Sequence, residues 1–215
     1  DDTEWVNLLI SELRSRNIAS YACYGPRNDP QWIDRAIHLN AVDSDPLKQT
    51  SPNLLINATL IFRPNELKSQ LDRLGIPVLQ TIPSLAIDAK SWRESTDGVS
   101  LDDISYYLAS SELVGMVDPM LITARNKQTG SLEPIPEQIA ALADKVAATL
   151  SLQNKTPIER KIAIFVYNYP LGEGNFGASF LNVPRSLENI LRAMKLAGYN
   201  VLEASSESLI AQLKS

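Results

Sequence analysis

Apolar and polar positions change period repeatedly along the chain. In residues 4–16, Trp5, Leu8, Leu9 and Leu13 recur at the spacing of one helical face. Patterns of the same kind predict helices over residues 30–39, 65–75, 88–95, 100–113, 135–153, 185–198 and 206–214. Short apolar runs without this period predict strands over residues 18–24, 54–56, 76–82, 119–125, 161–170 and 199–204.

This alternation of helix and strand indicates βαβ units. It predicts an α/β fold, with a mainly parallel sheet and flanking helices in Rossmann- or flavodoxin-like units. Residues 126–134 have the composition of a turn and loop. The sequence "NKTP" at 154–157 breaks the longest helix, so we expect an α/β domain over 1–157. Residues 158–215 are expected to start a second α/β unit that is incomplete.

Composition limits the classes of function. Hydrophobic residues make up 44% of the 215 and charged residues 21%, which suits a packed core. The net charge of −5 and the lack of a basic run argue against nucleic-acid binding. No apolar stretch reaches the ~18–20 residues of a membrane span. The start is acidic and has no Met, so we expect a segment of a longer chain or one that has lost a leader.

Residues that could support catalysis or metal binding are few. Cys23 is the one cysteine and lies in an apolar run, which predicts a small core residue. His38 is the one histidine, and we interpret it as a side chain at the surface of a helix. A zinc site needs more Cys or His ligands than these two, and neither a G-x-S-x-G elbow nor a Walker lysine occurs. No metal site and no catalytic residue are predicted.

A glycine-rich loop follows the strongest predicted strand. Gly172, Gly174 and Gly177 have the G-x-G-x-x-G spacing of a dinucleotide fingerprint. Seven residues, "ASFLNVP", then separate the last glycine from the predicted helix, and the first suitable acid, Glu203, comes 26 residues later. A wide surface loop with glycines at positive φ therefore explains the pattern better than nucleotide binding.

The strand, loop and helix at 165–201 resemble the family of chelatase large subunits that comprises the CobN type of cobaltochelatase and the H type of magnesium chelatase. That family has an apolar strand, an N-Y-P or F-P-P stop, a G-N-x-G loop, and then a Leu-x-Val/Thr step into a serine-bearing helix that ends in Gly-Tyr-x-Val. The matching residues are Asn168, Tyr169, Pro170, Gly174, Asn175, Gly177, Leu181, Val183, Ser186, Gly198, Tyr199 and Val201. Weaker similarity extends upstream through "PNLLINAT" and through Trp92, Ser95, Gly98, Glu112 and Gly115. In that stretch Ser110-Ser111 replace the family's Leu-Pro.

The resemblance implies a fragment of a large tetrapyrrole-binding subunit. Such a chelatase is a ligase that forms metal–nitrogen bonds in cobalamin or chlorophyll-type biosynthesis, and it is expected in the cytoplasm. Co²⁺ or Mg²⁺ is its substrate metal, and cobalt is favoured by "NYP". ATP would be used by AAA+ partner subunits and not bound here. The macrocycle would be hydrogenobyrinic acid diamide or protoporphyrin, and the fragment alone would be inactive.

The loop and the start of the following helix are the candidate substrate site. Amide groups and an arginine can bind propionate or acetamide groups, and aromatic rings can lie against a macrocycle. The candidate residues are Asn168, Tyr169, Asn175, Phe176, Asn182 and Arg185. A loop that only packs two domains together remains an alternative. So does a different function, either a non-enzymatic two-lobed α/β module that binds a small ligand or a sugar- or nucleotide-utilising enzyme.

Overall fold

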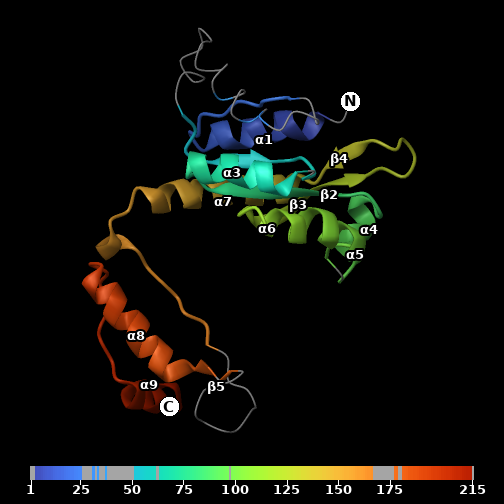
Figure 1. Cartoon of the computed structure of the whole chain (residues 1–215). Coiled ribbons are helices and arrows are strands. Elements are labelled where there is room, and N and C mark those ends of the chain that lie inside the picture. The colour runs from blue at the N-terminus through green and yellow to red at the C-terminus, as the bar shows by residue number, and fades with distance from the viewer. Residues whose placement is uncertain are drawn as a thin grey trace. The chain divides into compact units, whose positions relative to one another are not determined.

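The computed structural model describes residues 3–25, 31, 33, 37, 51–61, 63–96, 98–166, 177–178 and 181–214. The chain divides into two compact units, unit 1 (Asp1–Leu150) and unit 2 (Ser151–Ser215). Figure 1 labels the elements of both units along the chain. The division falls inside helix α7 (Pro136–Gln153). Each unit is described by itself. The predicted domain boundary at 157/158 stays a prediction.

Unit 1 contains a four-stranded sheet in the order β1-β2-β3-β4. The strands are β1 (Leu55–Asn57), β2 (Val78–Ser84), β3 (Val117–Arg125) and β4 (Leu132–Pro134). The first three are parallel, with Leu55 opposite Val78 and Leu79 opposite Val117, and β4 is antiparallel to β3. The predicted mainly parallel α/β fold is therefore confirmed. Residues 126–134 were expected to be a loop throughout, but their end forms β4 because a short hairpin pairs it with β3.

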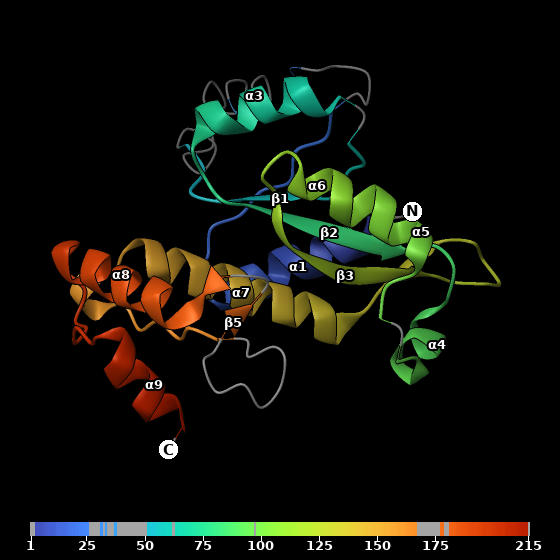
Figure 2. The same cartoon turned by 60° about the horizontal axis from the view of Figure 1, so that its bottom comes forward.

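Helices cover both faces of this sheet (Figure 2). The helical elements of unit 1 are α1 (Glu4–Ser15), α3 (Pro64–Leu74), α4 (Ala89–Glu94), α5 (Leu101–Asp103), the π-helix η2 (Ile104–Ala109), α6 (Ser110–Glu112) and α7 (Pro136–Gln153). On one face, α1 and α7 bury Leu9 and Leu142 against Leu79 and Ile122. On the other, α3 packs on β2 and η2 packs on β2 and β3. Burial on both faces explains why β2 and β3 lack the strict alternation of apolar and polar residues that is typical of a half-exposed strand.

Local sequence features explain several helix ends in unit 1. Gly75 ends α3 with a φ of 62°, a left-handed conformation that glycine adopts without strain. Ser100 caps α5, since its Oγ accepts a hydrogen bond from the Asp103 amide at 3.2 Å. Trp5 and Trp92 are partly buried against the core, whereas Trp32 lies outside the described residues.

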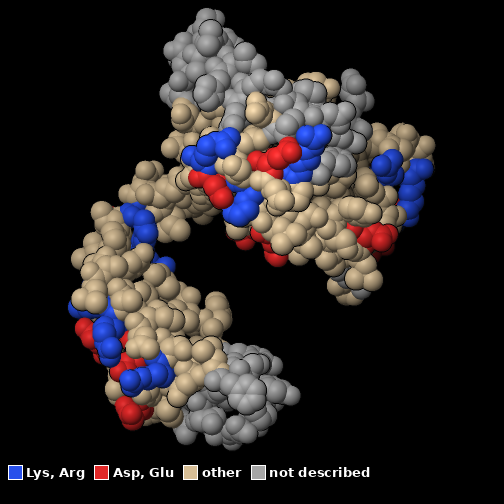
Figure 3. Space-filling model, in the orientation of Figure 1, with Lys and Arg blue, Asp and Glu red and all other residues tan. Residues whose placement is uncertain are grey.

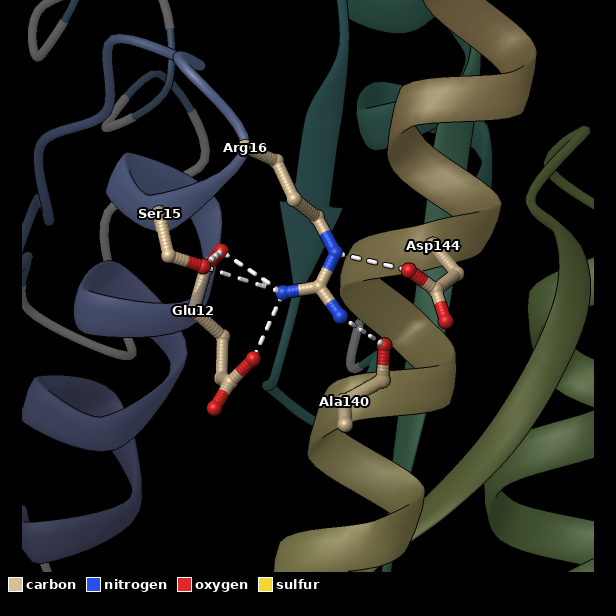
Figure 4. Close-up of polar contacts among 5 residues, drawn as sticks. All are labelled: Glu12, Ser15, Arg16, Ala140 and Asp144. Atoms are coloured by element: carbon tan, nitrogen blue, oxygen red, sulfur yellow. Dashed lines mark hydrogen bonds and ion pairs between the residues drawn. The ribbon is translucent and has the colours of Figure 1, made fainter.

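A single arginine joins α1 to α7 (Figure 4). Arg16 donates from Nε to the Asp144 carboxylate at 2.7 Å and from Nη2 to the Ala140 carbonyl oxygen at 3.3 Å. Its Nη1 donates to the carboxylate and the carbonyl oxygen of Glu12. The hydrogen bond to Asp144, followed by the one to Glu12, raises the pKa of Arg16. Five donors on one planar group thus fix the end of α1 against α7.

Helices are the longest elements among the described residues of unit 2. Its elements are the 3₁₀ turn η3 (Pro157–Glu159), the short strands β5 (Gly177–Ala178) and β6 (Leu181–Asn182), and the helices α8 (Val183–Leu196) and α9 (Ser206–Lys214). β5 and β6 form an antiparallel pair, with Gly177 opposite Asn182. Arg160 donates to the Tyr199 hydroxyl at 3.2 Å, which connects the residues after η3 to the end of α8.

Three of the predicted strands are not strands in the structure. Residues 18–24, 161–166 and 199–204 have no regular secondary structure, and the rest of the run 161–170 lies outside the described residues. Cys23, in the first of them, was predicted to be a core residue but is exposed. A strand forms only when a neighbour pairs with its backbone, and these segments have no ladder partner within the described part of the chain.

Candidate functional site

Two of the six predicted site residues form the first turn of α8. Asn182 is the N-cap, and its Oδ1 accepts a hydrogen bond from the Arg185 amide at 3.0 Å. The Ser186 Oγ donates in turn to the Asn182 carbonyl oxygen at 2.9 Å. Val183 and Pro184 are buried and anchor this turn. The sequence folds this way because Asn caps a helix well and Pro suits its first positions.

The Arg185 side chain leaves this turn toward solvent. It is 65% exposed, and its Nη1 lies 3.6 Å from the Glu188 Oε2. Glu188 is only 16% exposed and has two other partners, the Arg192 guanidinium at 3.1 Å and the Ser206 amide at 3.2 Å. The contact with Arg185 is the longest of the three. Glu188 therefore joins α8 to the start of α9 without needing Arg185.

The other four predicted site residues, Asn168, Tyr169, Asn175 and Phe176, lie outside the described residues, as do Gly172 and Gly174. The structure describes the end of the glycine loop, where Gly177 pairs with Asn182. It brings Asn182 and Arg185 together in one helical turn. How the remaining four are placed relative to that turn stays a prediction, and His38 also lies outside the described part of the chain.

A buried polar network at the carboxyl end of β1 was not predicted from the sequence. The Asn57 amide donates to the Gln80 Oε1 at 2.7 Å and to the Thr59 carbonyl oxygen at 2.9 Å. Gln80 donates to the Thr81 carbonyl oxygen, and the Thr81 hydroxyl donates to the Asn57 carbonyl oxygen. Asn57, Gln80 and Thr81 are all buried. Polar letters inside the apolar runs "LLIN" and "VLQT" were the available signal. Because the amides bond to one another, the network has a structural role.

Charged groups beyond the ends of β2 and β3 also pair with one another. Asp88 caps α4 by accepting from the Ser91 amide at 2.8 Å, and its other oxygen lies 3.1 Å from the Lys127 Nζ. The amide of Ser91, followed by Lys127, lowers the pKa of Asp88. Arg93 binds the Glu137 carboxylate through two nitrogens, which lowers the pKa of Glu137. These four side chains are paired with one another, so they are not free to bind a charged ligand at this edge of the sheet.

The described part of the chain contains neither a cluster of metal-ligand side chains nor a helix that could span a membrane. No three His, Cys, Asp or Glu side chains there are grouped so that they could hold a metal ion. None of the helices in those residues is long and apolar enough to cross a membrane. The first turn of α8 is the candidate site for its own chemistry. It combines an exposed guanidinium with a helix N-terminus, where anions are stabilised.

Comparison with known proteins gives a family match over the whole chain. The family model described as CobN/Magnesium Chelatase matches residues 1–215. The chain is 30% identical over 146 residues to the chloroplastic magnesium-chelatase subunit ChlH of Oryza sativa subsp. indica, a match of 66% of this chain and 10% of that protein. It is 30% identical over 183 residues to the aerobic cobaltochelatase subunit CobN of Pseudomonas aeruginosa, a match of 79% of this chain and 15% of that protein.

A solved structure has the same fold. The catalytic subunit of cobaltochelatase from Mycobacterium tuberculosis superimposes with a TM-score of 0.71 and 19% sequence identity, over 99% of this chain and 19% of that one. This chain therefore spans less than a fifth of the length of each of these three relatives.

Proposed function

Because the chain belongs to the CobN/magnesium chelatase family, we propose that it is a segment of a chelatase large subunit that inserts a divalent metal ion into a tetrapyrrole. The family match over residues 1–215 is the observation that carries this proposal. Relatives named for magnesium chelatase and for cobaltochelatase both match, so Mg²⁺ and Co²⁺ are the two candidate substrate metals. We favour Co²⁺ because of the "NYP" sequence at 168–170.

The reaction defines what the complete subunit must do. As a divalent ion enters a porphyrin, the ring loses its two pyrrole protons, which balances the charge of the metal; a corrin ring loses its single inner N–H proton, and the complex keeps one positive charge. The ion must also shed water, and the ring must be held while it does so. Domains that close around the ring can exclude solvent during this step. We propose that AAA+ partner subunits hydrolyse ATP to drive closure, that the complex acts in the cytoplasm, and that residues 1–215 alone are inactive.

We further propose that the glycine loop and the first turn of α8 bind a peripheral group of the macrocycle. Hydrogenobyrinic acid diamide and protoporphyrin both carry carboxylates at the ring edge. Arg185 is exposed and its ion pair with Glu188 is long, at 3.6 Å. A substrate carboxylate can replace Glu188 at Arg185, because Glu188 retains Arg192 and the Ser206 amide. A bidentate guanidinium–carboxylate pair would then fix one edge of the ring.

The remaining candidate residues support the same model through their chemistry. Asn168 and Asn175 carry amides that can bond acetamide or carboxylate groups. Tyr169 and Phe176 carry rings that can lie on the macrocycle face. Asn182 acts by capping α8 and so sets the position of Arg185.

A binding titration of the full-length subunit tests the site. Tetrapyrrole absorbance is followed while a corrinoid precursor or a porphyrin is added to wild type, to Asn175→Ala and to Arg185→Ala. We expect Arg185→Ala to weaken binding about 10- to 100-fold, the range for a lost charge-assisted pair. Arg185→Lys should restore only part of the affinity, because it cannot bind in the bidentate geometry.

A matched control uses an arginine farther along the same helix. Arg192→Ala removes the other exposed partner of Glu188, and it should leave affinity within about twofold if Arg185 acts directly. Unchanged affinity in Asn175→Ala and Arg185→Ala would remove the loop from the binding site. Failure of the purified full-length protein, with its partner subunits and ATP, to convert any tetrapyrrole to a metal complex would contradict the chelatase proposal itself.

A further inference from the structure

The helical segment Leu101–Leu113 exposes an apolar stripe. Its apolar residues Leu101, Tyr106 and Leu113 are 84%, 64% and 73% exposed. Ser105 and Ala109 lie between the two leucines at four-residue steps and are also exposed, so these positions follow successive turns on one side of the segment. The opposite side is packed, because Tyr107 and Val114 are buried in the core. We call Leu101, Ser105, Tyr106, Ala109 and Leu113 the apolar stripe.

Acidic groups border the apolar stripe and basic groups are absent from the sequence around it. Asp102 and Glu112 are exposed on the same helical segment. From residue 94 to residue 124 the sequence contains no lysine or arginine. Figure 3 agrees, since the blue atoms that it shows on unit 1 gather near α3 and the β3–β4 hairpin. Asp103 takes no part because it is buried and bonded to the Ser100 hydroxyl.

This combination selects one class of partner. Single exposed leucines are ordinary, but two leucines on one line of a helical segment with an exposed tyrosine beside that line indicate an interaction surface. A membrane surface is a poor match, because helices that bind membranes carry Lys and Arg beside their apolar face. Nucleic acid is a poor match for the same reason. A helix with an apolar face and flanking Lys or Arg residues complements both the stripe and its acidic border.

The length of the stripe also suits a helix. From Leu101 to Leu113 it runs ~18 Å, since each helical residue rises about 1.5 Å. Three turns of a partner helix cover that distance. The segment includes a six-residue π-helix, η2, and such segments are frequent where proteins form functional contacts.

We propose that the apolar stripe binds a basic, apolar-faced helix from elsewhere in the same, longer polypeptide. The chain spans only 10% to 15% of the curated relatives described above. This inference rests on the proposal that the chain is a segment of such a large subunit, in which most of the polypeptide that could supply the helix is covalently linked. A linked partner has an effective concentration near the millimolar range, far above that of most separate proteins. This inference concerns a surface remote in sequence from the proposed tetrapyrrole loop and stands independently of it.

Photo-crosslinking of the full-length subunit tests the proposal. p-Benzoyl-phenylalanine takes the place of Tyr106 and, in a control protein, of Lys68, which is half exposed on α3. After irradiation, mass spectrometry identifies the linked peptide. We expect the Tyr106 position to link to a peptide of the same polypeptide outside residues 1–215 that contains Lys or Arg beside apolar residues. Links only to another protein, only within residues 1–215, or no more abundant than at Lys68, would overturn the proposal.

Charge reversal provides a second, independent measurement. In the crosslinking protein, Asp102→Lys with Glu112→Lys should lower the yield of that link about fivefold, because both positions would then repel the basic partner. The matched control, Glu66→Lys with Asp72→Lys, reverses two exposed acids on α3 and should leave the yield unchanged. Equal yields in both variants would contradict the role of charge in partner choice. Circular dichroism verifies that each variant folds.

Discussion

Similar apolar runs are buried in the sheet of unit 1 but exposed and unpaired in the described part of unit 2. In unit 1 the runs of β2 and β3 are buried between helices, and Leu79, Ile82 and Ile122 are each only 1% exposed. In unit 2 the runs at 161–166 and 199–204 have no regular secondary structure and no strand partner among the described residues, with Phe165 97% and Leu202 88% exposed. Apolar residues favour a strand in both units, yet a sheet forms only where neighbouring strands complete the hydrogen-bonded ladder.

The largest expected difference between the two units is in how much an apolar side chain contributes to the free energy of unfolding. Leu142→Ala, at a fully buried position in α7, should lower the free energy of unfolding by ~2–5 kcal/mol, because it leaves a cavity. Leu202→Ala should change it by less than about 0.5 kcal/mol. Urea unfolding of the 215-residue chain, followed by circular dichroism, measures both. An equal loss in the two variants would mean that Leu202 is buried in solution.

Tryptophan fluorescence sharpens the same experiment. Trp5, Trp32 and Trp92 all lie in unit 1, so the fluorescence signal reports unfolding of that unit alone. Circular dichroism also reports α8 and α9. We expect the circular dichroism signal to begin changing at a lower urea concentration than the fluorescence signal.

The buried amide network of unit 1 should show the next largest effect. Asn57→Ala leaves the Gln80 Oε1 without its donor, which should cost ~1–3 kcal/mol of unfolding free energy. The double variant Asn57→Leu/Gln80→Leu removes both polar groups and should be less destabilised than Asn57→Ala. The fluorescence-detected urea transition measures both proteins. If the double variant were less stable than Asn57→Ala, the network would contribute more to stability than the hydrogen bond between these two amides.

In unit 2 the corresponding local feature is the cap of α8. Asn182→Ala removes the acceptor of the Arg185 amide and should cost ~1 kcal/mol of helix stability. Asn182→Ser should retain most of the cap. Hydrogen exchange of amides in α8, measured by mass spectrometry, should be faster in the alanine variant only. Identical exchange in all three proteins would show that the cap contributes nothing in solution.

The smallest expected effect is the pH dependence of unit 1. The Ser91 amide and Lys127 lower the pKa of Asp88, and Arg93 lowers the pKa of Glu137. A carboxylate with a lowered folded pKa stabilises the protein above its ordinary value, near 4, and loses this contribution as the pH falls through the folded value. The fluorescence-detected Tm should therefore drop below about pH 5.

Asp88→Asn tests the source of that dependence. The variant should have a lower Tm than wild type at pH 7 and a smaller further drop toward about pH 3. Asp72→Asn, which removes an exposed carboxylate paired with Lys68 on α3, is the matched control. A pH dependence as steep in Asp88→Asn as in wild type would assign the effect to other carboxylates.

Helices were more predictable from the sequence than strands. The periodic stretches of α1, α3, α7 and α8 are helices in the structure, because their caps and apolar faces are local features. The runs at 18–24, 161–166 and 199–204 failed as strands because pairing depends on residues distant in sequence. The Arg16 bridge between α1 and α7 was missed for the same reason, since Asp144 lies 128 residues away along the chain but adjacent in space.

The candidate site was predictable in part. Asn182 and Arg185 were identified from their position between a glycine loop and a helix, and the structure places both in the first turn of α8. The role of Glu188 as the shared partner of Arg185, Arg192 and the α9 amide was not visible, because it requires the packing of α9 against α8. A pattern of residues specifies a turn, whereas tertiary packing decides which charges meet.

Hydrogen exchange at residues 161–166 and 199–204 tests most directly whether the contrast between the units arises because this chain is a segment of a larger protein. It is measured on the 215-residue chain and on the full-length subunit under the same conditions. We predict that these amides exchange roughly 100-fold more slowly in the full-length protein, because strands from the remaining polypeptide complete the ladder. Equally fast exchange in both proteins would contradict this explanation.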